Sequence, residues 1–133
     1  MSSHYHAVVW IDHREARVFH FNALEAEKTL VRSHHPDQHL HHKANAGDSG
    51  HAPVDNEFLQ RVVVALAEAG AILITGPSSG KTELDAYIKR HHPTLQGHIS
   101  GIETLDHPSD GELLAHARKF FKADDRMHTQ VHR

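Results

Sequence analysis

The sequence predicts an α/β domain with a mixed five-stranded sheet, its elements in the order β-β-β-α-β-α-β-α. Three observations support this fold class. Three short runs typical of strands precede residue 34, with only brief polar breaks between them. After residue 54 the apolar residues recur at helical spacing, and helices alternate with two short strands. The chain has 133 residues, the usual size of one domain, and we expect this domain to occupy residues 1–122.

The first three predicted strands cover residues 6–12, 16–21 and 28–33. Because their connections are so short, neighbouring strands should be antiparallel. The first strand is apolar at every position from Ala7 to Ile11, which is typical of a central strand buried on both faces. The second mixes Arg17 and His20 with apolar residues and should lie nearer an edge.

A long loop should follow, over residues 34–53. Its sequence, "HHPDQHLHHKANAGDSGHAP", is polar and glycine-containing and includes six histidines. Loops of this length are uncommon within a compact domain and are frequently functional, so we expect this one to extend from the domain as a flexible arm.

The second half should contain three helices and two strands. The first helix has an apolar stripe that includes Phe58 and Leu66 and ends at Gly70. A capping box formed by Ser109 and Glu112 begins the last helix. No pattern continues into residues 123–133, which we expect to form a flexible tail. The predicted helices cover residues 54–69, 79–91 and 109–122, and the strands 71–75 and 97–105, with a weak point at Gly101.

Composition excludes several classes of protein. There is no cysteine, which excludes disulfides, thiolate catalysis and cysteine-based zinc sites and agrees with a cytoplasmic location. No apolar run approaches the roughly 18 residues of a membrane span, and the N-terminus does not resemble a signal peptide. The net charge of −3 argues against nucleic-acid binding by bulk electrostatics alone, although 17 histidines make this charge sensitive to pH.

The stretch "GPSSGKT", residues 76–82, is similar to a phosphate-binding loop of nucleotide hydrolases. It is one residue too short, and Pro77 lacks a backbone N–H that such a loop would use. We therefore expect no nucleotide hydrolysis, and favour a tight turn in which a serine caps the next helix. The same helix start also suits an RNA phosphate, which makes Ser78, Ser79 and Lys81 candidate contacts.

The sequence offers candidates for two kinds of metal site. The element order is that of ribonuclease-H-like folds, whose nucleases hold two metal ions with converging carboxylates. Asp12, Asp55 and Glu57 are available, but the fourth strand ends at Thr75 and Gly76 without a carboxylate, so we interpret Asp12 as a turn-former. The second site is an alternative function for the long loop, in which histidines bind Zn²⁺, Ni²⁺ or Cu²⁺. Its candidate ligands are His35, His39, His41 and His42. No resident cofactor is expected.

The stretches "AILITGPSSGKTELDAYIKRHHP" and "GIETLDHPSDGELLAHARKFF" resemble a group of small bacterial translational machinery proteins. These are similar to the central domain of eukaryotic and archaeal peptide-chain release factors and of the ribosome-rescue factor Pelota. The resemblance covers residues 7–121 and implies the same fold. It also implies that residues 76–84 mark this fold, rather than a nucleotide site.

In release factors, the loop between the third strand and the first helix carries the catalytic Gly-Gly-Gln tripeptide. This chain has "NAGDSGHAP" there and no Gly-Gly-Gln. The resemblance therefore implies a non-catalytic accessory protein that binds the ribosome, tRNA or rRNA. The alternative is a weak peptidyl-tRNA or aminoacyl-tRNA esterase with His51 as base. Separately, an exposed sheet edge would allow the chain to form a homo-oligomer. The candidate binding residues are Lys43, Gly47, Ser49, Gly50, His51, Arg61, Ser78, Ser79 and Lys81.

Overall fold

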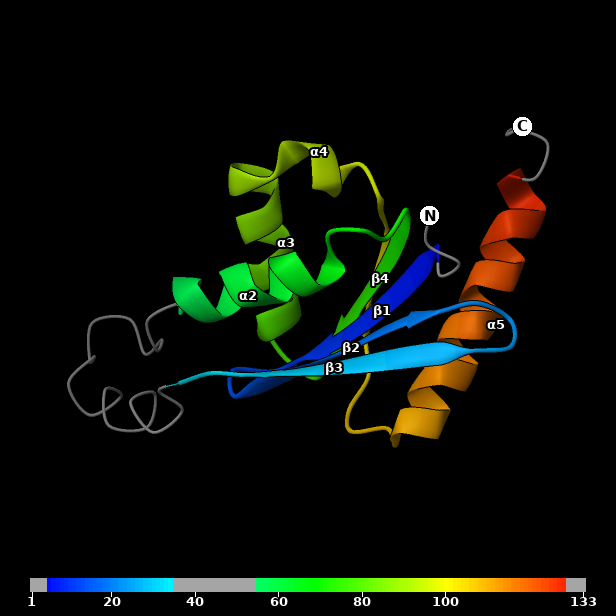
Figure 1. Cartoon of the computed structure of the whole chain (residues 1–133), viewed down its shortest axis with the longest axis horizontal. Helices are drawn as coiled ribbons and strands as arrows, with labels where there is room; N and C mark the ends of the chain where they lie inside the picture. Colours follow the sequence, from blue (N-terminus) through cyan, green and yellow to red (C-terminus); the bar gives the residue numbers. More distant parts are fainter. Residues whose placement is uncertain (1–4, 35–54, 129–133) are drawn as a thin grey trace.

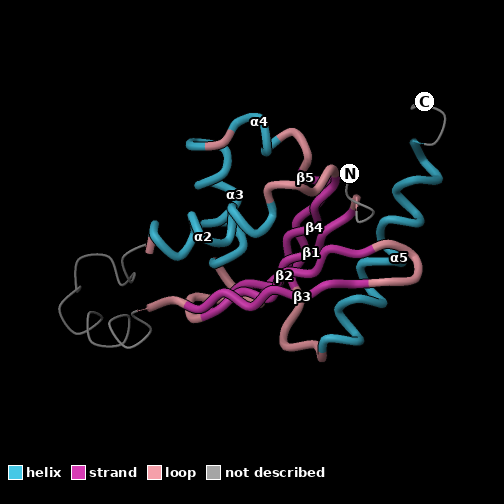
Figure 2. Tube along the Cα trace, viewed as in Figure 1, coloured by secondary structure: helices cyan, strands magenta, loops and turns pink. Residues whose placement is uncertain are grey.

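The computed structural model describes residues 5–34 and 55–128, with side chains described up to residue 123. A mixed five-stranded sheet forms its centre, with the strand order β3-β2-β1-β4-β5 (Figures 1 and 2). The predicted fold class is confirmed. Strands β1, β2 and β3 pair antiparallel, whereas β4 is parallel to both β1 and β5. The strands are β1 (His6–Ile11), β2 (Glu15–Phe21), β3 (Ala26–Arg32), β4 (Ala71–Gly76) and β5 (Ile99–Thr104).

Helices cover both faces of this sheet. Helices α2 and α3 lie on one face, with the short α4 following α3, and α5 lies on the other (Figures 1 and 2). The helices are α2 (Asn56–Leu66), α3 (Gly80–His91), α4 (Pro93–Gln96) and α5 (Asp110–His128). No helix in the described part of the chain is long and apolar enough to cross a membrane.

Strand β1 separates two hydrophobic cores. Because side chains alternate along a strand, Val9 and Ile11 pack toward α2 and α3, while Val8 and Trp10 pack toward α5. All four are at most 1% exposed. This double burial explains the uninterrupted apolar run and confirms the central position predicted for β1. Strand β2, predicted nearer an edge, is second from one edge of the sheet.

Trp10, which belongs to the core on the α5 side of the sheet, also contacts the segment that leads into α5. The indole Nε1 donates hydrogen bonds to the carbonyl oxygens of Leu105, at 3.2 Å, and Asp106, at 2.9 Å. The Arg17 guanidinium lies 4.6 Å from the centre of the Trp10 ring and pairs with Asp110 at 2.8 Å. Trp10 therefore links the sheet to the segment that precedes α5.

Several boundaries differ from the prediction. Strand β3 begins at Ala26, two residues early, because it stays paired with β2 as far as Phe21. Pro93, expected only to stop a helix, also begins the short α4, since proline is favoured in a first helical turn. Helix α5 continues past residue 122 to His128, because no glycine or proline interrupts it. Residues 129–133 of the predicted tail lie outside the described residues, as does nearly all of the loop 34–53.

The weak point predicted in the last strand is present. The pairing of β5 with β4 shifts register between Ile72, opposite Ile99, and Leu73, opposite Gly101, so one residue of β5 is left over. Such a bulge bends an edge strand and breaks the regularity of its exposed edge. Edge strand β5 is therefore less regular than β3, which pairs with β2 along its whole length.

Candidate functional site

Three segments that are far apart in sequence meet at the carboxyl ends of β1 and β4. They are the turn between β1 and β2, the start of α3, and the positions where the segment 35–54 leaves and rejoins the domain. After β1 the chain continues to β2, toward one edge of the sheet, and after β4 it continues through α3 to β5, toward the other edge. In α/β sheets such a reversal of strand order at the carboxyl ends is the usual place of a ligand site.

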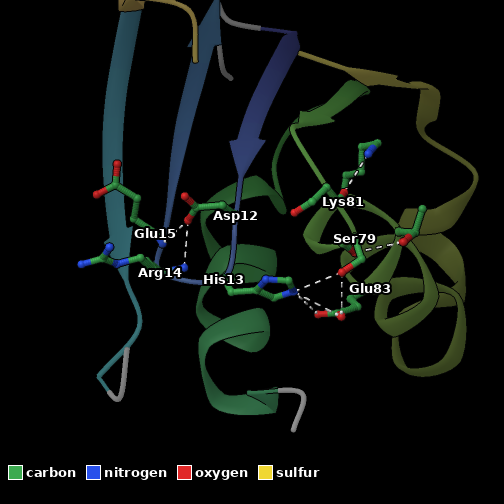
Figure 3. A network of polar contacts seen from close by, with 9 residues as sticks. Asp12, His13, Arg14, Glu15, Ser79, Lys81 and Glu83 are labelled. Carbon is green, nitrogen blue, oxygen red and sulfur yellow. Dashed lines mark hydrogen bonds and ion pairs between the residues drawn. The ribbon is translucent and has the colours of Figure 1, made fainter. Parts of the chain in front are cut away.

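The turn between β1 and β2 is held by Asp12. Its Oδ1 accepts hydrogen bonds from the backbone N–H groups of Arg14, at 2.8 Å, and Glu15, at 2.9 Å. This arrangement confirms Asp12 as a turn-former. It leaves the Arg14 residue exposed and turns the His13 ring toward the start of α3 (Figure 3).

The turn between β4 and α3 packs directly on the end of β1. A Cβ atom at Gly76 would lie 2.2 Å from the carbonyl oxygen of Ile11, and one at Gly80 would lie 3.3 Å from the backbone of Asp12. Only glycine permits the first approach. The glycines of "GPSSGKT" therefore have a packing role, which accounts for them without a phosphate ligand.

The expected serine cap of α3 is wrong. Ser79 occupies the N-cap position, but its side chain makes no capping hydrogen bond, because its backbone is already helical, with φ −74° and ψ −10°. Its Oγ lies 3.3 Å from His13 Nε2 and 3.4 Å from Glu83 Oε2 (Figure 3). The predicted contact Lys81 donates from Nζ to the carbonyl oxygen of Ser78 at 2.7 Å.

His13 and Glu83 join the two turns. The His13 Nε2 lies 3.2 Å and 3.3 Å from the two carboxylate oxygens of Glu83. The hydrogen bond with Glu83 raises the pKa of His13 above its usual 6.5, the charges of Glu83 and Asp12 act in the same direction, and partial burial opposes them. The protonated imidazole is the form that this pairing favours.

Ser79, His13 and Glu83 are residue types found in hydrolytic triads, but their geometry differs from one. In a triad the nucleophile and the carboxylate contact opposite nitrogens of the histidine ring. Here Ser79 and Glu83 both contact Nε2. The cluster therefore connects two turns rather than activating a serine. Sequence reasoning missed it, because His13 and Glu83 are 70 positions apart and the stretch 76–84, which contains Glu83, gives no sign of a histidine partner.

A set of hydrogen bonds, which we call the loop base, holds the two ends of the segment 35–54 together. Ser33 Oγ donates to Asp55 Oδ2 at 2.8 Å, while Asp55 Oδ1 caps α2 by accepting from Phe58 N at 3.0 Å. Arg61 Nη2 donates to the carbonyl oxygen of Arg32 at 2.6 Å. The predicted contact Arg61 thus lies at the loop base and uses one guanidinium nitrogen to hold it.

The surface beside the loop base is open and carries charges of both signs. A pocket of about 460 Å³ lies here, between the turn after β1 and the end of β3. Arg32 Nε approaches Glu15 Oε1 only to 3.8 Å, and the Arg32 side chain is 71% exposed. The residues that line it are Asp12, Arg14, Glu15, Arg32 and Ser33.

The structure describes four of the predicted binding residues, Arg61, Ser78, Ser79 and Lys81, at the loop base and the start of α3. Lys43, Gly47, Ser49, Gly50 and His51 lie outside the described residues. The same holds for the alternative metal ligands His35, His39, His41 and His42, and for the proposed esterase base His51. Within residues 5–34 and 55–128, no three histidine, aspartate or glutamate side chains are grouped so as to hold a metal ion.

Comparison with known proteins gives a match at the level of structure only. No model of a known protein family matches the sequence, and no curated protein matches it either. Among solved structures, Pelota from Archaeoglobus fulgidus matches with a TM-score of 0.60 and 10% identity over 93% of this chain. The archaeal translation termination factor aRF1 matches with a TM-score of 0.56 and 14% identity over 93%. Saccharomyces cerevisiae Dom34 matches with a TM-score of 0.57 and 12% identity over 94%.

These matches concern one part of longer proteins. The chain spans 36% of the Pelota and Dom34 chains and 39% of aRF1. Identity this low shows the fold alone. The predicted resemblance is confirmed in that sense, and the chain has a fold like that of the central domain of release factors and Pelota.

Proposed function

We propose that this chain is a ribosome- or RNA-associated accessory protein, located in the cytoplasm, that acts by binding and without catalysis. One observation carries the proposal, namely that 93–94% of the chain matches two structures whose descriptions name translation termination. One of these is described as a translation termination factor, and another as a translation termination-like factor involved in RNA quality control pathways. Since one fold can serve several functions, the test of the proposal measures binding itself.

The loop base supports a binding role for the segment 34–53. In the release factors that the chain resembles, the functional loop also joins the third strand to the first helix. Here the bond from Ser33 to Asp55 fixes both ends of the segment beside the exposed residues Arg14 and Arg32. Fixing the ends of a binding segment lowers the entropy lost when a partner is bound. In this proposal Lys43 and His51 extend the contact begun by the two arginines.

Two features support binding without catalysis. The sequence contains no Gly-Gly-Gln, the tripeptide on which peptide release depends in the release factors that the chain resembles. The cluster of Ser79, His13 and Glu83 shares a single imidazole nitrogen, which does not suit acyl transfer. Peptidyl-tRNA hydrolysis is accordingly not part of the proposal.

Sedimentation with purified bacterial ribosomes tests the proposal. The full chain, made without an affinity tag, should move with ribosomes at low salt and partly separate at moderate salt, because contacts with phosphate weaken as salt rises. Absence from the ribosomal fraction at both salt concentrations, together with the absence of RNA crosslinks in lysate, would refute it.

A pair of double variants locates the contact. Arg14→Ala with Arg32→Ala removes two positive charges beside the loop base, and should weaken co-sedimentation and its dependence on salt. Lys119→Ala with Lys122→Ala removes two exposed charges from α5, on the opposite face of the sheet, and should leave co-sedimentation unchanged. Equal effects of the two double variants would show that the loop base is not the contact surface.

A further inference from the structure

A second pocket, which we call the α2–α3 groove, lies between these two helices. It has a volume of about 320 Å³, which is within the range of small-molecule sites. Asn56 contributes from the first turn of α2. Glu83, Tyr87 and Arg90 contribute from one face of α3, where they are spaced by four and three residues, and the small Ala86 lies between them. Glu83 also belongs to the cluster with His13, so the groove borders the site described above.

The groove holds an aromatic ring whose position is fixed by hydrogen bonds. The Tyr87 hydroxyl donates to Gln60 Oε1 at 2.7 Å, and His92 Nε2 lies 2.9 Å from the same oxygen. The His91 ring also contacts the Tyr87 ring, with 4.5 Å between the ring centres and a tilt of 44°. A ring held in this way is ready to pack against a planar ligand with little loss of side-chain entropy.

The groove also has a distinct charge distribution. Arg90 is exposed and makes no ion pair with any residue in the described part of the chain, whereas its neighbour Lys89 lies 3.7 Å from Asp85. The acidic end of the groove is balanced, since the Glu83 carboxylate is paired with His13. An anionic group is therefore attracted to the Arg90 end.

From this arrangement we infer that the α2–α3 groove binds a ribonucleotide unit, with its base against Tyr87 and His91 and its phosphate beside Arg90. The Asn56 amide offers a donor and an acceptor to a base edge. This inference rests on the proposed association with RNA and gives that association a second contact. The ligand has two possible sources, a free nucleotide or a nucleotide within an RNA strand, and both share the chemistry of a base joined to a phosphate.

Two variants of the full chain and one control test the inference. Ala86→Leu fills the groove with a good helix former, and Arg90→Ala removes the unpaired cation. Lys89→Ala removes the same charge one residue away, outside the groove. Binding of a fluorescent oligoadenylate is measured by anisotropy, and binding of AMP by amide chemical shifts. Ala86→Leu should weaken oligoadenylate binding roughly tenfold, the size expected from losing one stacked base. Arg90→Ala should weaken the binding and reduce its dependence on salt, because it removes a phosphate contact, while the control changes the affinity less than about twofold.

The outcomes separate the two sources and the two proposals. Shifts at Tyr87, Arg90 and His91 with AMP alone indicate a free nucleotide, and shifts only with oligoadenylate indicate an RNA strand. No binding of either probe by the wild-type chain, equal binding by all variants, or displacement by an oligoglutamate peptide as effective as oligoadenylate would overturn the inference. If the wild-type chain co-sediments with ribosomes but neither AMP nor oligoadenylate binds in the groove, the proposed function stands and the groove inference fails. If oligoadenylate binding depends on the groove but the chain neither co-sediments with ribosomes nor crosslinks to RNA, the groove inference stands and the proposed function fails.

Discussion

At the carboxyl ends of β1 and β4, contacts with the backbone explain which residue types are present better than a catalytic or ligand-binding role does. Gly76 is present because the Ile11 carbonyl oxygen occupies the space of a side chain, and Asp12 is present because two backbone N–H groups need an acceptor. A sequence resembling a phosphate-binding loop arises at this turn from close packing. Motif similarity at such a turn therefore has to be weighed against the contacts of each residue.

Gly76→Ala should destabilise the protein by roughly 1 to 3 kcal/mol, because the new methyl group forces the ends of β1 and β4 apart. Gly111→Ala is the matched control, since nothing lies within 4 Å of a Cβ at that position in α5. It should be neutral or raise the free energy of unfolding by up to about 1 kcal/mol, as alanine favours helices. Urea denaturation compares the two, and a Gly76→Ala protein as stable as Gly111→Ala would disprove the packing role of Gly76.

His13 should make stability depend on pH. Its folded-state pKa is raised above 6.5 by the hydrogen bond with Glu83. The stabilisation is therefore fully present below pH 6.5, and is lost as pH rises through the folded-state pKa. The difference in free energy of unfolding between wild type and His13→Gln should accordingly be larger at pH 6 than at pH 9. NMR titration of the His13 ring provides the second measurement, and Glu83→Gln should lower its pKa. A pKa unaffected by Glu83→Gln would contradict the pairing of these two residues.

At the scale of elements, the helices begin in different ways. Helix α5 has a complete capping box, as predicted, in which Ser109 N donates to Glu112 Oε1 at 2.9 Å and Glu112 N donates to Ser109 Oγ at 3.1 Å. Helix α2 is capped by Asp55, whereas α3 has no side-chain cap. The start of α3 is held instead by its packing on β1 and by the pairing of His13 with Glu83.

Ser109→Ala should therefore lower the free energy of unfolding by about 1 kcal/mol, the usual effect of losing an N-terminal cap. Ser79→Ala removes a serine at the corresponding position of α3, where no capping bond exists, and should cost clearly less. Thermal or urea denaturation of both variants provides the comparison. If Ser79→Ala proved the more damaging, packing and the His13–Glu83 pair would not be what holds the start of α3.

At the scale of the whole molecule, local patterns predicted the element order and the central place of β1, but not the side-chain contacts between elements. Periodicity reveals which residues are buried, as it did for Phe58 and Leu66. The pairing of His13 with Glu83 and the bond from Ser33 to Asp55 depend on the completed fold, which brings together residues distant in sequence. The burial of individual residues was therefore predictable from the sequence, whereas the contacts that make up the candidate site were not.

The loop base also joins two elements directly through their side chains. The hydrogen bond from Ser33 to Asp55 links the residue after β3 to the residue that caps α2, although the two are 22 positions apart in the sequence. In general, the entropy of closing a loop grows only with the logarithm of its length. While this bond is kept, a longer segment grafted between the two residues is therefore expected to add little to the entropic cost of folding.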